Sequence, residues 1–395
     1  MILLLSGDEY VCKLGDTFYI SDHTQILLNR YLACFEKIKV AFRTKKVCNS
    51  DELGKYHNKV TDCRVELCDM PFFQGPAQFA KKYFSVMNAA KKAAQGADIA
   101  IVRLPSTTAF AVWKVCRKRS IPYATEIVFD CHDAYVAAKS KSIRFIWKTL
   151  HNMQTKACNN ALGVACVTRD YLQTHYFPTS PDAVVSNYSS IEMAPEFLFK
   201  PRKYESDKQF TIVHTANQVF FGSRKGHNQL IEALSIVRSR GIDAKIVFIG
   251  EDYNDGFAKL TEYAKSLGVA NKIHFTGFLN RTELKKNLEE ADLAVMPTKA
   301  EGLPRVIIEA MAMGLPCITT PVSGNPELID KEFLVPYDNV EGIADRITSL
   351  LSDKDLYEKT SEENFNRSKE YTTEVLNPRR TKFYNSIRSM VENKY

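Results

Sequence analysis

A chain of 395 residues with 45% hydrophobic side chains is too long for one small core and too apolar to be disordered, so we expect two globular domains. Residues 1–200 carry 26 Lys and Arg against 18 Asp and Glu, a net charge of +8, whereas the remaining residues carry 27 against 28. No run approaches the roughly 18 to 20 apolar residues that cross a bilayer, and the ten cysteines form no zinc-like cluster. A membrane-spanning or disulfide-stapled protein is thereby excluded, and reduced thiols in the cytoplasm are expected.

The first half contains three short apolar runs that are predicted to be buried strands, at residues 1–5, 97–102 and 122–129. The first run is too short for the apolar core of a signal peptide. Strands of this kind, each followed by a polar loop, favour a Rossmann-like domain over residues 1–190. A helical pattern over residues 378–395 is predicted to pack back across a domain surface.

The second half, residues 191–377, alternates β-branched runs with amphipathic stretches, which is typical of a parallel sheet covered on both faces. Strands are predicted at 211–215, 244–250, 273–276, 293–297 and 316–320, and helices at 226–240, 255–267, 281–290 and from Pro304. This order predicts a second doubly wound, Rossmann-like domain. Residues 186–209 lack periodicity and are predicted to connect the two domains.

One helix of the second half carries the clearest signal. Pro304 suits a first helical turn, and Gly314 followed by Pro316 ends the helix. Between residues 306 and 313 the helix is apolar on every face except at Glu309, so this carboxylate is expected to be buried. Because an unpaired buried carboxylate is costly, we expect donors for it, either from the protein or from the hydroxyls of a ligand.

Glu301 precedes this helix, at the carboxyl edge of the sheet, where open α/β sheets bind ligands. The free N–H groups at the start of the helix favour a phosphate in the same place. Two carboxylates and a phosphate site together indicate a nucleotide-diphosphate sugar. The alternative is structural: a solvated Glu301 and a Glu309 that a core residue satisfies.

The segment EGLPRVIIE, residues 301–309, resembles the E-x7-E motif of the retaining glycosyltransferases of family 4, and the similarity continues to Ile329. The resemblance implies the GT-B fold, with two Rossmann-like, doubly wound domains that face a central cleft. It implies an acceptor domain at 1–190, joined by the helix at 378–395, and a donor domain at 191–377. It places Glu301 by the donor sugar, Glu309 on the ribose hydroxyls, and the N–H groups of Gly302 and Leu303 at the diphosphate.

Family members also place a Lys-Gly pair after the first strand of the donor domain, and Arg224-Lys225-Gly226 is similar. The resemblance makes Lys225 the cation that neutralises the diphosphate; a solvated loop is the alternative. The family usually has Gly-Arg directly after that strand, whereas this chain continues from His214 through other residues. Arg224 is therefore expected either to replace the missing guanidinium or to leave a weaker phosphate contact.

No metal and no other cofactor are expected, with the nucleotide sugar as co-substrate. Preorganised N–H groups and a cation can stabilise the departing diphosphate without a metal ion. The chain has one Asp-x-Asp sequence, Asp353-Lys-Asp355, which is predicted to cap a helix.

In the first half, His132 follows the strand at 122–129, and similar enzymes often have a His there that contacts donor sugar or acceptor. A structural role is the alternative for His132, and Asp133 is a weaker candidate. Residues 6–8 are expected to form a loop after the first strand, in which Gly7 permits close backbone contact with the donor.

Basic and aromatic residues occur together at residues 113–119 and 144–148. These segments are either solvated helix faces or a contact with anionic lipid headgroups at the inner face of a membrane. No nucleic-acid partner is expected.

The leading interpretation is a retaining, metal-independent hexosyltransferase that uses a nucleotide-diphosphate sugar, with UDP favoured, and acts on a glycan or lipid-linked saccharide in cell-surface polysaccharide synthesis. The alternatives are a non-catalytic GT-B-like protein that binds nucleotide sugar or glycan, and a nucleotide-sugar epimerase of the same fold. A nicotinamide-dependent dehydrogenase is excluded because the chain contains no Gly-x-Gly.

Overall fold

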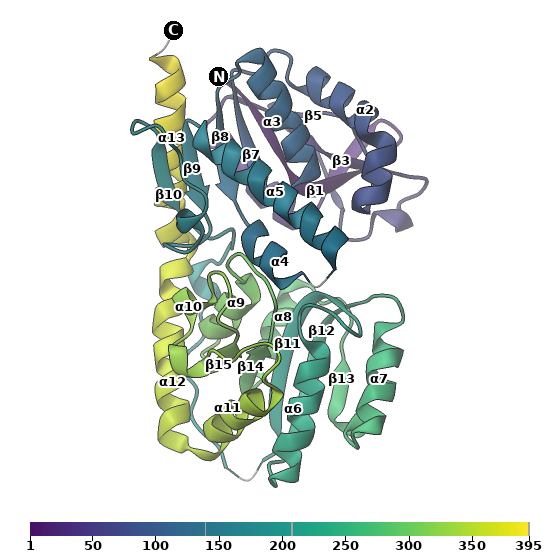
Figure 1. Ribbon diagram of the computed structural model, residues 1–395, viewed down its shortest axis with the longest axis vertical. Helices are drawn as coiled ribbons and strands as arrows, with labels where there is room; N and C mark the ends of the chain where they lie inside the picture. The colour runs from purple at the N-terminus through teal and green to yellow at the C-terminus, as the bar shows by residue number, and fades with distance from the viewer. Residues whose placement is uncertain (139, 207, 394–395) are drawn as a thin grey trace. The chain divides into compact units, whose positions relative to one another are not determined.

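The computed structural model describes residues 1–138, 140–206 and 208–393. The chain divides into two compact units (Figure 1), an N-terminal unit of residues 1–188 with 377–395 and a C-terminal unit of residues 189–376. The boundaries expected from the sequence, near 190 and 378, lie within two residues of these divisions. Helix α13 (Thr373–Glu392) begins in the C-terminal unit and continues into the N-terminal one.

A parallel sheet forms the centre of the N-terminal unit, with paired strands in the order β5-β3-β1-β7-β8-β9-β10. This is the order of a Rossmann fold. The strands are β1 (Ile2–Leu14), β3 (Lys37–Val47), β5 (Val65–Leu67), β7 (Ile99–Leu104), β8 (Tyr123–Ile127), β9 (Gly163–Cys166) and β10 (Val184–Asn187), with the short additions β2 (Thr17–Ile20), β4 (Asn58–Lys59) and β6 (Met70–Pro71). The helices are α1 (Asp22–Leu32), α2 (Gly75–Ala93), α3 (Thr107–Arg119), α4 (Cys131–Ala137) and α5 (Lys141–Asn159).

Strand β1 is longer than predicted, and the loop expected at residues 6–8 is wrong. The strand continues to Leu14, with an irregularity in its pairing to β3 between Ser6 and Tyr10. Its second part pairs with β2 in an antiparallel hairpin and contributes Cys12 to a small separate apolar cluster. These non-local partners extend a strand whose sequence turns polar after residue 5.

A buried carboxylate ties α13 into the N-terminal unit. Glu126, on β8, accepts hydrogen bonds from the hydroxyls of Tyr31, Tyr188 and Tyr384 at 2.9, 3.0 and 2.8 Å. Arg103, on β7, donates a further one at 2.8 Å. The charge is thus compensated inside the core, and the C-terminal helix, which supplies Tyr384, packs against the unit as its apolar pattern predicts.

The C-terminal unit is a second parallel sheet, with strands in the order β13-β12-β11-β14-β15. Its strands are β11 (Phe210–Val219), β12 (Ala244–Asp252), β13 (Ile273–Phe275), β14 (Leu293–Met296) and β15 (Cys317–Thr319). Its helices are α6 (His227–Ser239), α7 (Gly256–Ser266), α8 (Arg281–Glu289), α9 (Arg305–Ala312), α10 (Asn325–Leu328), α11 (Val340–Ser352) and α12 (Lys354–Ser368). The strands and helices predicted for this half are all present, with ends that shift by a few residues.

The strand order of this sheet reverses between β11 and β14, because β12 lies on one side of β11 and β14 on the other. Ligands of open α/β sheets bind at the carboxyl ends of the strands at such a point. The loops that follow β11 and β14 therefore form the natural binding region of this unit.

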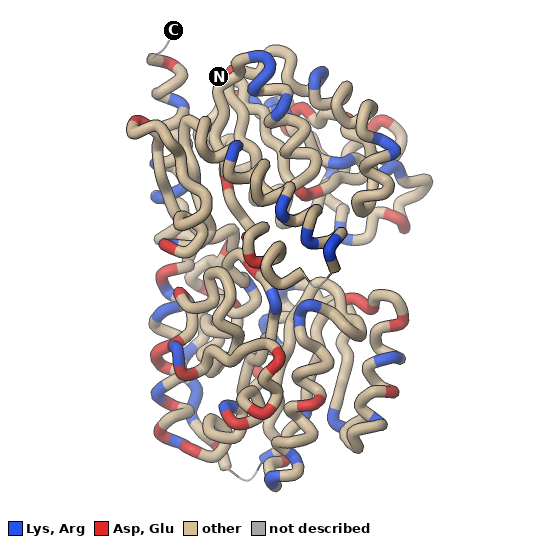
Figure 2. Tube along the Cα trace, in the orientation of Figure 1, with Lys and Arg blue, Asp and Glu red and all other residues tan. Residues whose placement is uncertain are grey.

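Charge divides between the units more sharply than between the halves of the sequence. The N-terminal unit has 30 Lys and Arg against 17 Asp and Glu, net +13, and the C-terminal unit has 23 against 29, net −6. Figure 2 shows Lys and Arg along α2, α3 and α5. The basic C-terminal helix accounts for part of the difference, since it belongs to the N-terminal unit.

Candidate functional site

The loops after β11 and β14 are held together by a close backbone contact. Gly226, at the start of α6, has φ +78°, and a Cβ atom there would lie 2.0 Å from the carbonyl oxygen of Pro297. The Lys299 N–H donates to the carbonyl of Arg224 at 2.9 Å. The glycine is therefore required by both its backbone conformation and the approach of the neighbouring loop.

This contact brings the predicted Lys225 and Glu301 together. The Lys225 ammonium forms an ion pair with Oε1 of Glu301, which also accepts a hydrogen bond from the Thr298 hydroxyl at 2.9 Å. The Glu301 N–H donates to Oγ of Ser323 at 3.4 Å. Glu301 is 8% exposed. The sequence does not single out Thr298 or Ser323, although Ser323 lies within the similarity that continues to Ile329.

The start of α9 leaves backbone donors unused next to this ion pair. Gly302 and Leu303 are buried, and their N–H groups have no hydrogen-bonding partner among the residues that the structure describes. The Gly302 carbonyl accepts from the N–H of Gly324 at 2.9 Å, which fixes the turn. Buried, unpaired N–H groups are uncommon in folded proteins and suit an anionic ligand.

Glu309 lies half-buried on α9, whereas the apolar pattern of the helix predicted a buried carboxylate. Burial raises the pKa of its carboxyl group, and the positive charges of Arg305 and Arg281 oppose that shift. Within the described part of the chain, no side chain or N–H group donates a hydrogen bond to the Glu309 carboxylate. The donors expected for this carboxylate are thus not supplied by the neighbouring residues.

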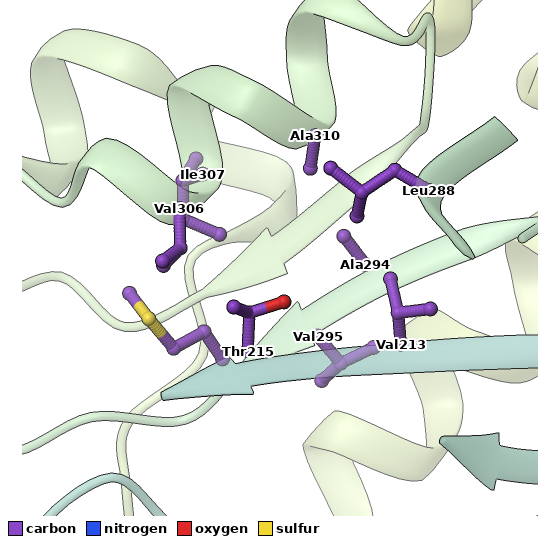
Figure 3. A pocket seen from close by; sticks show the side chains of 9 residues that line it. Val213, Thr215, Leu288, Ala294, Val295, Val306, Ile307 and Ala310 are labelled. Carbon is purple, nitrogen blue, oxygen red and sulfur yellow. The ribbon is translucent and has the colours of Figure 1, made fainter. Parts of the chain in front are cut away.

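Helix α9 packs tightly on the sheet. A cavity of about 10 Å³, room for about one water molecule, remains between α9, α8 and strands β11 and β14. Figure 3 shows Val306, Ile307 and Ala310 of the helix above Val213 and Thr215 of β11. This packing fixes the start of α9 relative to the strand ends. The cavity itself is too small for a nucleotide sugar.

Two buried histidines, which the sequence analysis did not assign, underlie the Lys225 loop. His214 on β11 and His227 at the start of α6 have ring centroids 4.7 Å apart, and Nδ1 of His214 lies 3.0 Å from the carbonyl oxygen of Val295. Burial, together with the charge of Lys225, lowers the pKa of His227 to about 4 and that of His214 well below its ordinary value. Both rings are therefore neutral near pH 7.

The remaining predicted residue of this loop, Arg224, is exposed. The segment that replaces the usual Gly-Arg continues β11 to Val219, with a pairing irregularity between Thr215 and Gln218. Arg224 thus follows an extended strand and a turn.

The predicted residues of the first half lie in the N-terminal unit. His132 is in the first turn of α4, where its N–H donates to Oδ1 of Asp130 at 2.8 Å. Asp133 accepts a hydrogen bond from the Tyr171 hydroxyl at 2.7 Å. Gly7 lies within β1, where a Cβ atom would approach Glu9 to 2.4 Å, so its small size serves packing inside the unit.

The two basic and aromatic segments differ in exposure. On α3, Trp113 is buried and the basic side chains follow at the end of the helix. On α5, Ile143, Phe145 and Ile146 are exposed beside Lys141, Arg144 and Lys148, and Phe145 is 72% exposed. Of these two segments, only the one on α5 exposes apolar and basic side chains together. No helix in the described ranges has the length and apolarity needed to cross a bilayer.

Comparison with known proteins agrees with this architecture. Residues 195–367 match the model of a family described as glycosyl transferases group 1. The chain is 26% identical over 401 aligned residues to Protein CapJ of Staphylococcus aureus, covering 100% of this chain and 98% of CapJ.

Among solved structures, sucrose-phosphate synthase from Thermosynechococcus elongatus is similar with a TM-score of 0.72 at 14% identity, covering 98% of this chain and 99% of that one. HepE of Anabaena, in complex with UDP and glucose, is similar with a TM-score of 0.65 at 15% identity, covering all of both chains. The chain therefore has the GT-B fold, with a Rossmann-like sheet in each unit. The family match adds that residues 195–367, in the C-terminal unit, are similar to glycosyl transferases of group 1.

Proposed function

We propose that the protein is a retaining glycosyltransferase that moves a hexose from a nucleotide-diphosphate sugar to a hydroxyl of a glycan or lipid-linked saccharide in cell-surface polysaccharide synthesis. The observation that carries this proposal is the Lys225–Glu301 ion pair beside the unpaired N–H groups of Gly302 and Leu303. A cation, backbone donors and a helix start form a site for a diphosphate, and the neighbouring carboxylate suits sugar hydroxyls.

Donor binding rearranges this ion pair. The diphosphate carries more negative charge than one carboxylate, so it competes with Glu301 for the ammonium group of Lys225. Glu301 is then available to the hydroxyls of the donor sugar while Thr298 still holds one of its oxygens. Glu309, whose carboxylate has no donor from the described residues, is assigned to the ribose hydroxyls, and Arg224 to the outer phosphate.

Transfer breaks the bond between the anomeric carbon and the diphosphate oxygen, and the acceptor hydroxyl forms the new bond on the same face of the sugar. The acceptor proton passes to the departing diphosphate. Lys225 and the N–H groups of Gly302 and Leu303 stabilise the charge that develops on the leaving group. His132, in the N-terminal unit, is assigned to a hydroxyl of the donor sugar or the acceptor. Gly7, which has no side chain, is assigned to close backbone contact with the donor.

A UDP-hexose is the favoured donor. The structure of HepE with UDP and glucose supports this choice. The C-terminal unit has a net charge of −6, so a few placed groups, rather than general attraction, must bind the diphosphate.

The acceptor is assigned to the N-terminal unit, whose charge of +13 the donor does not explain. Exposed apolar and basic residues of α5 suit a peripheral contact with anionic headgroups at the cytoplasmic face of a membrane. A lipid-linked saccharide would be reached from that position.

Thermal unfolding of the full chain against a panel of UDP- and GDP-sugars tests the donor. A ligand at 100 times its Kd stabilises the folded protein by about 2.7 kcal/mol, so the correct nucleotide gives a saturable rise in Tm. Absence of stabilisation by any nucleotide sugar, where UDP and GDP alone also fail, would contradict a donor site.

Product analysis with the stabilising donor then separates transfer from the two alternatives. A protein that binds the donor without turnover is favoured by one feature, the absence of the Gly-Arg pair that usually follows the first strand of this domain. An epimerase would convert the donor in the absence of an acceptor. NMR of the product shows whether the anomeric configuration is retained. Because the proposed leaving-group stabilisation uses no metal, added Mg²⁺ or Mn²⁺ should not change turnover.

A further inference from the structure

Three side chains from two segments of the N-terminal unit converge at the start of α4. Asp130 caps this helix, His132 lies in its first turn, and His175 follows the segment after β9. One ligand atom from each of the three residues lies within 4.8 Å of the others. The two imidazole rings have centroids 4.2 Å apart, inclined by 31°.

In the described part of the structure, each of these three side chains has one buried polar atom without a hydrogen bond. Oδ2 of Asp130 and the Nδ1 atoms of His132 and His175 are buried and have no hydrogen-bonding partner among the described residues. Oδ2 of Asp130 lies 3.6 Å from Nδ1 of His175, beyond hydrogen-bonding range and close to the spacing of two ligands on one tetrahedral ion. Asp130 itself has no exposed surface.

The supporting contacts hold these atoms in place. Oδ1 of Asp130 accepts hydrogen bonds from the Tyr176 hydroxyl at 2.9 Å and from the His132 N–H at 2.8 Å, which leaves Oδ2 directed to the cluster. His151 is near, but its Nδ1 lies 3.1 Å from the Tyr176 hydroxyl. Partners that orient a ligand through its second atom are characteristic of metal sites.

The charge of the region favours a cation. Asp133 lies beside Asp130, and Oδ1 of Asp133 is 3.8 Å from Nδ1 of His132. Asp130 and Asp133 therefore place two carboxylates beside the imidazole of His132. A divalent ion would compensate the charge of these two carboxylates.

From this geometry we infer that Asp130, His132 and His175 bind a divalent transition-metal ion, Zn²⁺ in the first instance, with a fourth position open to water or substrate. Two imidazoles and one carboxylate are a ligand set that Zn²⁺ accepts in proteins. The inference goes beyond the proposed transfer and departs from the expectation of no metal in the chain. It leaves the diphosphate site on Lys225 unchanged, and ligation through Nδ1 leaves Nε2 of His132 able to contact a sugar hydroxyl.

Metal binding to the full chain tests the inference directly. After chelation and buffer exchange, titration calorimetry with Zn²⁺ should show one equivalent bound, and Zn²⁺ should raise the Tm. His175→Ala should weaken Zn²⁺ binding by about 100-fold or more. His57→Ala, which removes an exposed histidine paired with Asp22 in the same unit, is the matched control and should bind as the unaltered protein does.

Co²⁺ gives a readout that does not depend on the stability of a variant. The unaltered protein with one equivalent of Co²⁺ should show the visible absorption of a tetrahedral site with nitrogen and oxygen ligands, and Zn²⁺ should abolish it. No bound equivalent in the unaltered protein, or binding that survives His175→Ala undiminished, would overturn the inference. Since the readout is metal binding, its failure leaves the proposed transfer untouched, and failure of the donor screen leaves the metal site untouched.

Discussion

The ammonium group of Lys225 is paired with the carboxylate of Glu301, 76 residues further along the chain. The pair forms because β11 and β14 are neighbours in the sheet, so the loops at their carboxyl ends meet. In the absence of a ligand, the Glu301 carboxylate is the partner of the Lys225 ammonium group. If the proposed donor binds here, its diphosphate replaces the Glu301 carboxylate as the partner of Lys225.

Glu301→Ala should slow transfer severely without unfolding the protein. The carboxylate is the group assigned to the reacting sugar, and loss of one such placed group lowers kcat by about 10²- to 10³-fold. Initial rates of sugar transfer measure the effect. Glu358→Ala removes the carboxylate of a surface ion pair with Lys203 in the same unit and should be fully active. A Glu301→Ala variant with normal turnover would disprove the assigned role.

Lys225→Ala should weaken donor binding. A hydrogen bond to a charged group is worth about 1.5–3 kcal/mol, so the Kd for the nucleoside diphosphate should rise by roughly 10- to 100-fold. Titration calorimetry with the diphosphate measures this, and Lys203→Ala, the surface counterpart, should have no effect. Equal affinity in the Lys225 and Lys203 variants would show that the diphosphate binds elsewhere.

Gly226→Ala should destabilise the C-terminal unit and impair donor binding. The new methyl group would meet the Pro297 carbonyl at 2.0 Å, in addition to the strain of a φ of +78°. Backbone strain and overpacking each cost about 1–3 kcal/mol. Gly241→Ala has a similar φ of +88° but open space around the methyl group, so it isolates strain alone. Urea unfolding should place Gly226→Ala well below Gly241→Ala; equal stabilities would refute the close contact.

Stability should fall as the pH is lowered from about 6.5 to 4. The pKa of His227 is about 4 in the folded protein, whereas an ordinary histidine, as in the unfolded chain, has a pKa of 6.5. Between these two pH values the unfolded chain therefore binds a proton that the folded chain does not. The stabilisation is complete above pH 6.5, and about 3 kcal/mol is lost by pH 4.

Urea unfolding across this pH range, on the unaltered protein and on His227→Leu, measures the effect. The variant should lose the part of the slope that belongs to His227. Buried His214, whose pKa is also lowered, continues to contribute in both proteins. Identical pH profiles would mean that His227 is not buried in its neutral form.

Phe145→Ser should reduce binding to anionic vesicles. Phe145 is 72% exposed on α5, between basic residues, and burying such a side chain is worth about 1.5–3 kcal/mol, or roughly tenfold and more in affinity. Flotation with phosphatidylserine-containing and with neutral vesicles measures it. Phe84, 81% exposed on α2 of the same unit, provides the control variant Phe84→Ser. Equal flotation with both vesicle types would make α5 a merely solvated surface.

Local patterns in the sequence were sufficient for much of the C-terminal unit. Strands β11, β12 and β14 and helices α6 to α9 follow from periodicity, and Asp353 caps α12 through the Leu356 N–H as its sequence predicts. The candidate residues Glu301 and Glu309 were also identifiable, because their spacing and the Pro304 helix start lie within one short segment. Such signals depend on neighbours a few residues apart, which the sequence contains directly.

The tertiary structure alone decided which distant groups meet. Three features depend on strand order and on packing between distant segments. They are the contacts of Glu301 with Ser323 and Lys225, the extension of β1 by β2 and β3, and the cluster of Asp130, His132 and His175. No local propensity encodes a contact of this kind, because its energy exists only when both segments are already in place. The sequence by itself thus determined the fold class and the candidate carboxylates of the C-terminal unit, while the tertiary structure determined their partners and brought Asp130, His132 and His175 together in the other unit.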